Sequence, residues 1–176
     1  MKPRTLQIHL QKELSHLYDA HEAAAIATRY VTDRFGLSTA QLLLNDDVLL
    51  SAAEEEQTQR DVEQLLAQVP VQQVVGFEWF CGHRFRVTAD TLIPRPETEG
   101  LVHLATERCC GALSNILDVG TGSGCIAISL AKALPLARVA AWDISEGALQ
   151  VAQANATTLG ASVDFQLRDV LKEAET

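Results

Sequence analysis

The apolar positions of the first seventy residues follow the period of a helix. A helix that buries one side carries apolar residues every three or four positions, and one stripe of leucines has this spacing: Leu6, Leu10, Leu14 and Leu17. A second helix is predicted from Ala20 to Phe35, with Gly36 as its C-terminal cap. A further helix is predicted between Ser51, which forms a capping box with Glu54, and Pro70. Residues 1–70 are therefore expected to form a small all-helical domain.

Beyond Pro70 the pattern becomes that of strands and then of a stiff connector. Short β-prone runs follow one another at Val74–Val75, Phe77–Phe80 and Phe85–Val87, and the last two suggest a hairpin. Two prolines, Pro94 and Pro96, then forbid regular helix and predict an extended elbow. Residues 71–96 are expected to link two domains. Glu97 and Glu99 should enter the first turn of the next helix, where negative charge complements the helix dipole.

The last eighty residues alternate between apolar strands and helices. Strands are predicted at 116–119, 139–142 and 163–167, with helices at 125–134 and 145–159 between them. Strands that alternate with helices imply a parallel sheet covered on both faces. Residues 97–176 are therefore expected to form an α/β unit.

Composition and charge narrow the class of protein. With 176 residues, 47% hydrophobic and 21% charged, the chain has the make-up of a globular protein. It has no apolar run of roughly 20 residues and no recognisable leader, so we expect a cytoplasmic protein without a membrane partner. A net charge of −9 makes it a poor platform for direct nucleic-acid binding.

Two clusters of chemically interesting residues have plain structural interpretations. Acidic residues gather between Asp46 and Glu63, including Asp61, and predict a solvated helix face or, alternatively, a surface for a basic protein partner. The cysteines form no CxxC pair and lie far from most histidines, so free thiols are expected rather than a metal site or disulfides. They are Cys81, Cys109, Cys110 and Cys125.

The sharpest motif lies between a predicted strand and a predicted helix. It reads Gly120, Thr121, Gly122, Ser123 and Gly124, directly after Asp118 and Val119. Glycines permit the tight turn and let a ligand approach the backbone, and the following helix start offers free N–H groups. Such a loop alone is weak evidence for any one cofactor, because nicotinamide enzymes also carry one. The nicotinamide fingerprint, however, requires a small residue at the position where this chain has Cys125. The acid before the loop, in addition, suits a ligand with an amino-acid ammonium group.

Two further strand ends carry carboxylates. Asp143 lies about twenty residues beyond the loop, where a carboxylate can accept both ribose hydroxyls, although it could also simply cap a helix. Asp169, followed by Val170, ends the third strand and could border an adenine, although aspartate there is commonly a turn former. Three successive strand ends with such residues predict one cofactor site.

Three segments of the chain resemble the HemK-like release-factor glutamine methyltransferases. They are Phe85-x-Val87, residues 92–99 (LIPRPETE) and residues 116–124 (ILDVGTGSG). The Pro-Arg-Pro-Glu-Thr-Glu run is the most specific, since generic methyltransferases lack it. The resemblance covers the whole chain, more loosely over the helical part. It implies a Rossmann-like methyltransferase domain of α/β class, incomplete here, with residues 97–176 as its front part. A small helical domain for substrate recognition, residues 1–70, and a β-hairpin linker would precede it.

The resemblance also implies an activity and roles for the site. The family methylates the glutamine side-chain amide of the Gly-Gly-Gln motif in peptide chain release factors, which would be the protein partner, and its cofactor is S-adenosylmethionine. Gly120 to Gly124 would cradle the methionine part, Asp143 would hold the ribose, and Asp169 with Val170 would border the adenine. The elbow around Arg95 and Glu97 would line the methyl-transfer site or serve only as a rigid connector.

The family's catalytic Asn-Pro-Pro-Tyr motif does not occur in this sequence. No asparagine precedes a proline, because Asn45, Asn115 and Asn155 are followed by Asp, Ile and Ala. No catalytic residue is therefore assigned, and the 176-residue chain is expected to be inactive and prone to associate through an unpaired strand edge at 116–119. The alternatives are a non-catalytic cofactor- or protein-binding module and a nucleic-acid amino-group methyltransferase. A nicotinamide oxidoreductase is a more distant one.

Overall fold

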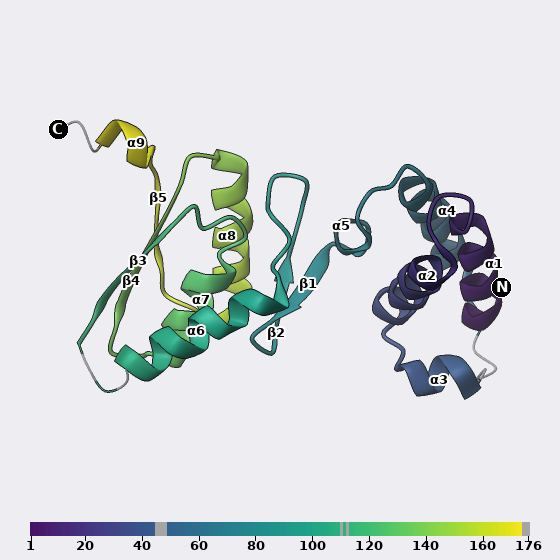
Figure 1. The fold of residues 1–176 in the computed structure, drawn as a ribbon, viewed down its shortest axis with the longest axis horizontal. Helices are drawn as coiled ribbons and strands as arrows, with labels where there is room; N and C mark the ends of the chain where they lie inside the picture. The colour runs from purple at the N-terminus through teal and green to yellow at the C-terminus, as the bar shows by residue number, and fades with distance from the viewer. Residues whose placement is uncertain (45–48, 110, 112, 174–176) are drawn as a thin grey trace. The chain divides into compact units, whose positions relative to one another are not determined.

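The computed structural model describes residues 1–44, 49–109, 111 and 113–173. The chain divides into two compact units, Met1–Val75 and Gly76–Thr176. No helix in the described part is long and apolar enough to cross a membrane. Figure 1 shows the order of the elements along the chain.

The first unit is helical, as predicted. Its described helices are α1 (Pro3–Leu14), α2 (Ala20–Phe35), α3 (Thr39–Leu44), α4 (Ala52–Leu66) and α5 (Val71–Val75). Gly36 caps α2 in the left-handed conformation, and Ser51 forms the expected capping box with Glu54. Leu17 does not join the leucine stripe, because α1 ends at Leu14 and the chain turns, leaving Leu17 exposed.

A buried polar network joins three helices of this unit. Asp61 accepts a hydrogen bond from Tyr30 Oη at 2.9 Å and lies 2.7 Å from Arg34 Nη2. Arg34 also donates to the carbonyl oxygen of Val74. Asp61 is only 1% exposed, so its placement on a solvated acidic face was wrong. The reason is that a buried carboxylate is tolerated when it is paired and hydrogen-bonded. Asp46 and Asp47 lie outside the described residues.

Two element boundaries near Pro70 differ from the prediction. The helix expected to reach Pro70 ends at Leu66, and Gln68 takes a left-handed φ of 63° that stops it. Val74 and Val75, predicted as a β-prone run, form the end of α5 instead. Their spacing from Val71 explains this, because one helical turn buries all three side chains.

The second unit begins with a hairpin and ends in an α/β layer. Strands β1 (Phe77–Phe80) and β2 (His83–Arg86) pair antiparallel. Helix α6 (Pro96–Cys109) then starts at the second proline of the elbow, with Glu97 and Glu99 in its first turn as predicted. The remaining elements are β3 (Asn115–Val119), α7 (Cys125–Ala133), β4 (Arg138–Asp143), α8 (Glu146–Leu159), β5 (Asp164–Leu167) and α9 (Val170–Glu173).

The sheet is parallel, in the order β3-β4-β5, and β3 is an edge strand among the described residues. Helices α7 and α8 lie on one side of it (Figure 1), and the core there contains Ala127, Val139 and Ala141. The expectation of helices on both faces is wrong for the described residues. Side chains of the other face, such as Leu117 at 46%, are exposed.

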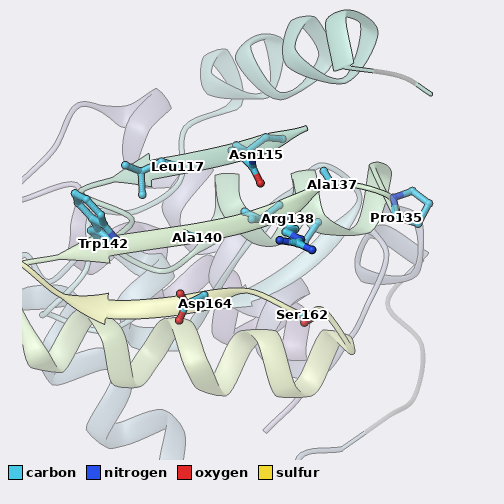
Figure 2. A pocket seen from close by; sticks show the side chains of 12 residues that line it. Asn115, Leu117, Pro135, Ala137, Arg138, Ala140, Trp142, Ser162 and Asp164 are labelled. Atoms are coloured by element: carbon cyan, nitrogen blue, oxygen red, sulfur yellow. The ribbon is translucent and has the colours of Figure 1, made fainter. Parts of the chain in front are cut away.

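A hollow of about 690 Å³ lies on this open face of the sheet. Figure 2 shows Leu117, Ala140 and Trp142 beside it, with Asp164 on the neighbouring strand. Several of its lining residues, among them Asn115 and Arg138, begin their strands. The hollow therefore reaches toward the amino ends of the strands, opposite the predicted cofactor site.

Candidate cofactor site

The glycine-rich loop closes tightly over the end of β4. The N–H groups of Gly120 and Thr121 both donate to the carbonyl oxygen of Trp142, at 2.8 and 3.0 Å. Inside the loop, the Gly124 N–H donates to the Thr121 carbonyl oxygen at 2.9 Å. The loop is thus a fixed turn between β3 and α7, at the carboxyl edge of the sheet where parallel α/β folds bind ligands.

Open space lies in front of one part of this loop and packed side chains behind another. A Cβ atom built on Gly122 would meet nothing within 4 Å, whereas one built on Gly124 would lie 2.9 Å from Ile128 Cδ1. Both glycines have positive φ, 56° and 79°. The loop can therefore accept a ligand at Gly122, while Gly124 packs closely against the helices behind it.

Asp143 ends β4 and uses both carboxylate oxygens on backbone N–H groups. One oxygen accepts from Gly122 at 2.8 Å, and the other accepts from Ser145 at 2.9 Å. The helix cap of α8 is provided by Ser145, whose hydroxyl accepts from the Ala148 N–H. Asp143 therefore joins the glycine loop to the start of α8. Each oxygen keeps a second lone pair for a ligand hydroxyl.

Asp118 is the second carboxylate beside the loop. Its Oδ2 accepts from the Thr121 hydroxyl at 2.7 Å. Burial raises the pKa of this carboxyl, the Thr121 hydrogen bond opposes the rise, and the nearby charge of Asp143 adds to it. A buried carboxylate with a like charge beside it is a suitable counter-ion for a cationic ligand group.

Asp169 and Val170 follow β5 and form the start of α9. The Arg168 N–H donates to the Asp143 carbonyl oxygen at 2.9 Å, so the ends of β4 and β5 lie side by side. Asp169 accepts from the Leu171 N–H at 3.1 Å, as a turn former does. Val170 is 41% exposed. The structure thus brings all three predicted strand ends to one edge.

The comparison with known families divides the chain in the same way. A model described as PrmC N-terminal domain matches residues 6–76, and one described as Methyltransferase domain matches residues 116–175. Release factor glutamine methyltransferase of Bacteroides thetaiotaomicron is 40% identical over 92% of this chain and 58% of that protein. Its namesake in Enterococcus faecalis is 44% identical over 86% of this chain and 55% of that protein. Over most of its length the chain is similar to release factor glutamine methyltransferases.

The chain spans about half the length of the curated relatives it matches. The Bacillus subtilis member of the family is 42% identical over 78% of this chain and 49% of its own length. Among solved structures, a ribosomal protein L11 methylase from Lactobacillus delbrueckii subsp. bulgaricus is 30% identical, with a TM-score of 0.43, over 52% of this chain and 47% of that chain.

The segment that precedes the Pro-Arg-Pro-Glu elbow approaches the start of α8. A Cβ built on Gly147 would lie 3.0 Å from Asp90 Cγ. Ile93 and Pro94 are buried, whereas Arg95 and Glu97 are exposed. Glu99 accepts from the Cys81 N–H at 2.8 Å and ties α6 to the hairpin. Both predicted uses of the elbow, as a wall or as a connector, stay open.

One residue of the site was missed from the sequence. Asn155 of α8 is 3% exposed and bonds to the glycine loop at Ser123 and to β2 at Arg86. The available signal was a polar residue on the buried face of an amphipathic helix, beside Ala152 and Ala156. A family resemblance based on strand ends does not draw attention to that position.

Proposed function

We propose that this chain is the substrate-recognition and cofactor-binding part of an S-adenosylmethionine-dependent methyltransferase that acts on release factors. The observation that carries the proposal is the glycine loop held by Asp143 at the carboxyl edge of the sheet, in a chain 40% identical to a named family member. The proposed acceptor is the glutamine side-chain amide of the Gly-Gly-Gln motif. Release factors work in translation, so the proposed location is the cytoplasm.

The residues beside the loop fit an S-adenosylmethionine molecule. Gly122 presents open space rather than a side chain, and together with Gly120, Thr121, Ser123 and Gly124 it is proposed to cradle the methionine part. The two carboxylates near the loop suit the cationic groups of this cofactor, whose ammonium and sulfonium are both positive. When bound, S-adenosylmethionine supplies the electrophilic methyl group.

The remaining roles follow the strand ends. Asp143 is proposed to accept hydrogen bonds from the ribose hydroxyls, and Asp169 with Val170 to border the adenine. Asp118 is proposed to stabilise the ligand's positive charge from behind the loop. All of these side chains bind and orient the cofactor, and none is proposed to transfer a proton.

Calorimetric titration of the purified chain with S-adenosylhomocysteine tests the cofactor assignment, with NADH as the control ligand. Saturable binding of S-adenosylhomocysteine alone is expected. Asp143→Ala should weaken it by roughly 10- to 100-fold, because a ligand hydroxyl and two backbone N–H groups lose their acceptor. Asp164→Ala is the matched control, since Asp164 begins β5 at the opposite edge of the same sheet.

Two results would refute this assignment. One is binding of NADH in place of S-adenosylhomocysteine, and the other is a folded chain, checked by circular dichroism, that binds neither. A release-factor pull-down together with a methyl-transfer assay then distinguishes a methyltransferase from a non-catalytic binding module. Binding without transfer would favour the non-catalytic module for this chain.

A further inference from the structure

The side-chain amide of Asn155 connects three parts of the second unit. Its Nδ2 donates to the Ser123 carbonyl oxygen at 2.9 Å and to the Arg86 carbonyl oxygen at 3.0 Å. Its Oδ1 accepts from the Arg86 N–H at 2.8 Å. Helix α8, the glycine loop and strand β2 therefore meet at one buried side chain.

A polar side chain at this place needs a reason. Asn155 is 3% exposed and stands on a helix face that otherwise buries small apolar residues, such as Ala152 and Ala156. Burying an amide costs free energy unless its groups are hydrogen-bonded. Both N–H groups and the oxygen of Asn155 have partners, so the cost is offset. The partners are backbone groups of Ser123 and Arg86, which these bonds satisfy.

The bond to Ser123 controls the orientation of the loop. The peptide group between Ser123 and Gly124 is planar, so fixing the Ser123 carbonyl also fixes the direction of the Gly124 N–H. The neighbouring glycines, Gly122 and Gly124, both have positive φ and restrict the backbone weakly. Asp143 holds the loop at the Gly122 N–H. Asn155 holds the following part, one residue further along.

The bonds to Arg86 connect Asn155, and through it the glycine loop, to the β-hairpin. Asn155 engages both backbone groups of Arg86, much as a neighbouring strand would. Arg86 is paired in register with Phe77 of β1, and Val87 N–H donates to the Gly76 carbonyl oxygen. The hairpin is therefore fixed in position at the residue that Asn155 holds. One amide therefore links the hairpin to the glycine loop.

We propose that Asn155 is a positioning residue for cofactor binding, whose buried amide fastens the glycine-rich loop at Ser123 to strand β2 at Arg86 and so holds the loop ready for the ligand. The role rests on the proposed cofactor function. Asn155 bonds to the backbone of Ser123 and Arg86, so it acts through the loop backbone.

The test compares three variants of the full chain with the wild type. Asn155→Ala removes the amide, and Asn155→Asp keeps its shape and its acceptor while removing both donors. Val102→Ala, in the core near Phe80 and Phe85, is the control for a general loss of packing. Affinity for S-adenosylhomocysteine is measured by calorimetry, and amide hydrogen exchange is measured on the free chain.

Both Asn155 variants are expected to bind S-adenosylhomocysteine roughly 10- to 100-fold more weakly, with Val102→Ala within about twofold of wild type. In the free Asn155 variants, exchange at the Gly122 and Gly124 amides should accelerate more than in the core of α7. If affinity stays near wild type, or exchange rises uniformly as in Val102→Ala, Asn155 is only a core residue and the proposal is wrong.

Failure of the proposed function gives a different pattern. If wild type itself binds no S-adenosylhomocysteine, the cofactor assignment fails, and the role of Asn155 in cofactor binding fails with it. Selective exchange at Gly122 and Gly124 in the same samples would then still show whether Asn155 holds the loop.

Discussion

Alanine at Gly124 should destabilise the second unit through two separate effects. Gly124 has a φ of 79°, which alanine adopts only at a cost of about 1–2 kcal/mol. The new Cβ would also lie 2.9 Å from Ile128 Cδ1 and 3.1 Å from Ala152 Cβ. The Ile128 methyl group ends a flexible side chain and can rotate away, but Ala152 Cβ has no rotamer, so α8 must give way by a few tenths of an ångström.

The crowding adds a second cost to the conformational one. Forcing a methyl group into a packed core typically costs about 1–3 kcal/mol. Added to the conformational cost, Gly124→Ala should lower the free energy of unfolding by about 2–5 kcal/mol. A small domain has only about 5–15 kcal/mol in total, so the change is large enough to measure with denaturant.

Gly122→Ala is the matched control, because its φ is also positive while its Cβ would meet nothing within 4 Å. It should cost only about 1–2 kcal/mol. Its methyl group would instead occupy the space proposed for the cofactor, so affinity for S-adenosylhomocysteine should fall. Comparison of the two substitutions thus separates the effect on the free energy of unfolding from the effect on ligand affinity.

Urea unfolding followed by far-ultraviolet circular dichroism measures the first quantity, and calorimetry measures the second. Equal destabilisation by both substitutions would refute the argument, since it would mean that the contact with Ala152 relaxes without cost. Unchanged affinity in Gly122→Ala would contradict the proposed position of the ligand.

Local patterns predicted most of the second unit. The strand and helix boundaries around the glycine loop agree within one or two residues, because strand ends, glycines and helix caps are all local signals. The parallel pairing followed from alternation alone. The predicted cover on both faces did not hold for the described residues, because alternation does not specify on which side each helix lies.

Long-range contacts explain the errors at Asp61 and Asn155. Asp61 looks like part of an acidic, solvated run, and only its contacts with Tyr30 and Arg34, 31 and 27 positions away, make it a buried residue. Asn155 contacts Arg86, 69 positions earlier. Neither pairing leaves a local pattern, since the partner of Asn155 is a backbone group that any residue provides.

Three further predictions test buried and exposed groups. Burial raises the pKa of Asp118, so the ionised carboxylate destabilises the folded state at pH 7. Asp118→Asn should therefore raise the urea midpoint of unfolding at pH 7 and weaken S-adenosylhomocysteine binding, and a lower midpoint would contradict this. Burial raises the pKa of Tyr30 from 10.0 to about 12, so the stability contributed by this residue is fully present below pH 10 and should be lost between pH 10 and 12. Tyr30→Phe should show no such decrease in the free energy of unfolding, and an equal decrease in the variant would contradict the assignment. Leu117 is 46% exposed on the open face of edge strand β3, so Leu117→Lys should reduce self-association in light scattering, whereas an unchanged mass would show that this face is not involved.

The loop end of the sheet concentrates the features that general folding rules disfavour. Glycines there hold positive φ, Asp118 is a half-buried carboxylate whose pKa is raised by burial, and a buried asparagine stands on a helix face of small apolar residues. Each of these lowers or risks stability by itself, and each is arranged around the same backbone turn. Features that cost stability persist where function needs them. The amino ends of the same strands carry no comparable arrangement among the described residues, although the hollow of the open face reaches toward them. The departures from stable packing therefore favour the carboxyl edge of the sheet as the candidate cofactor site.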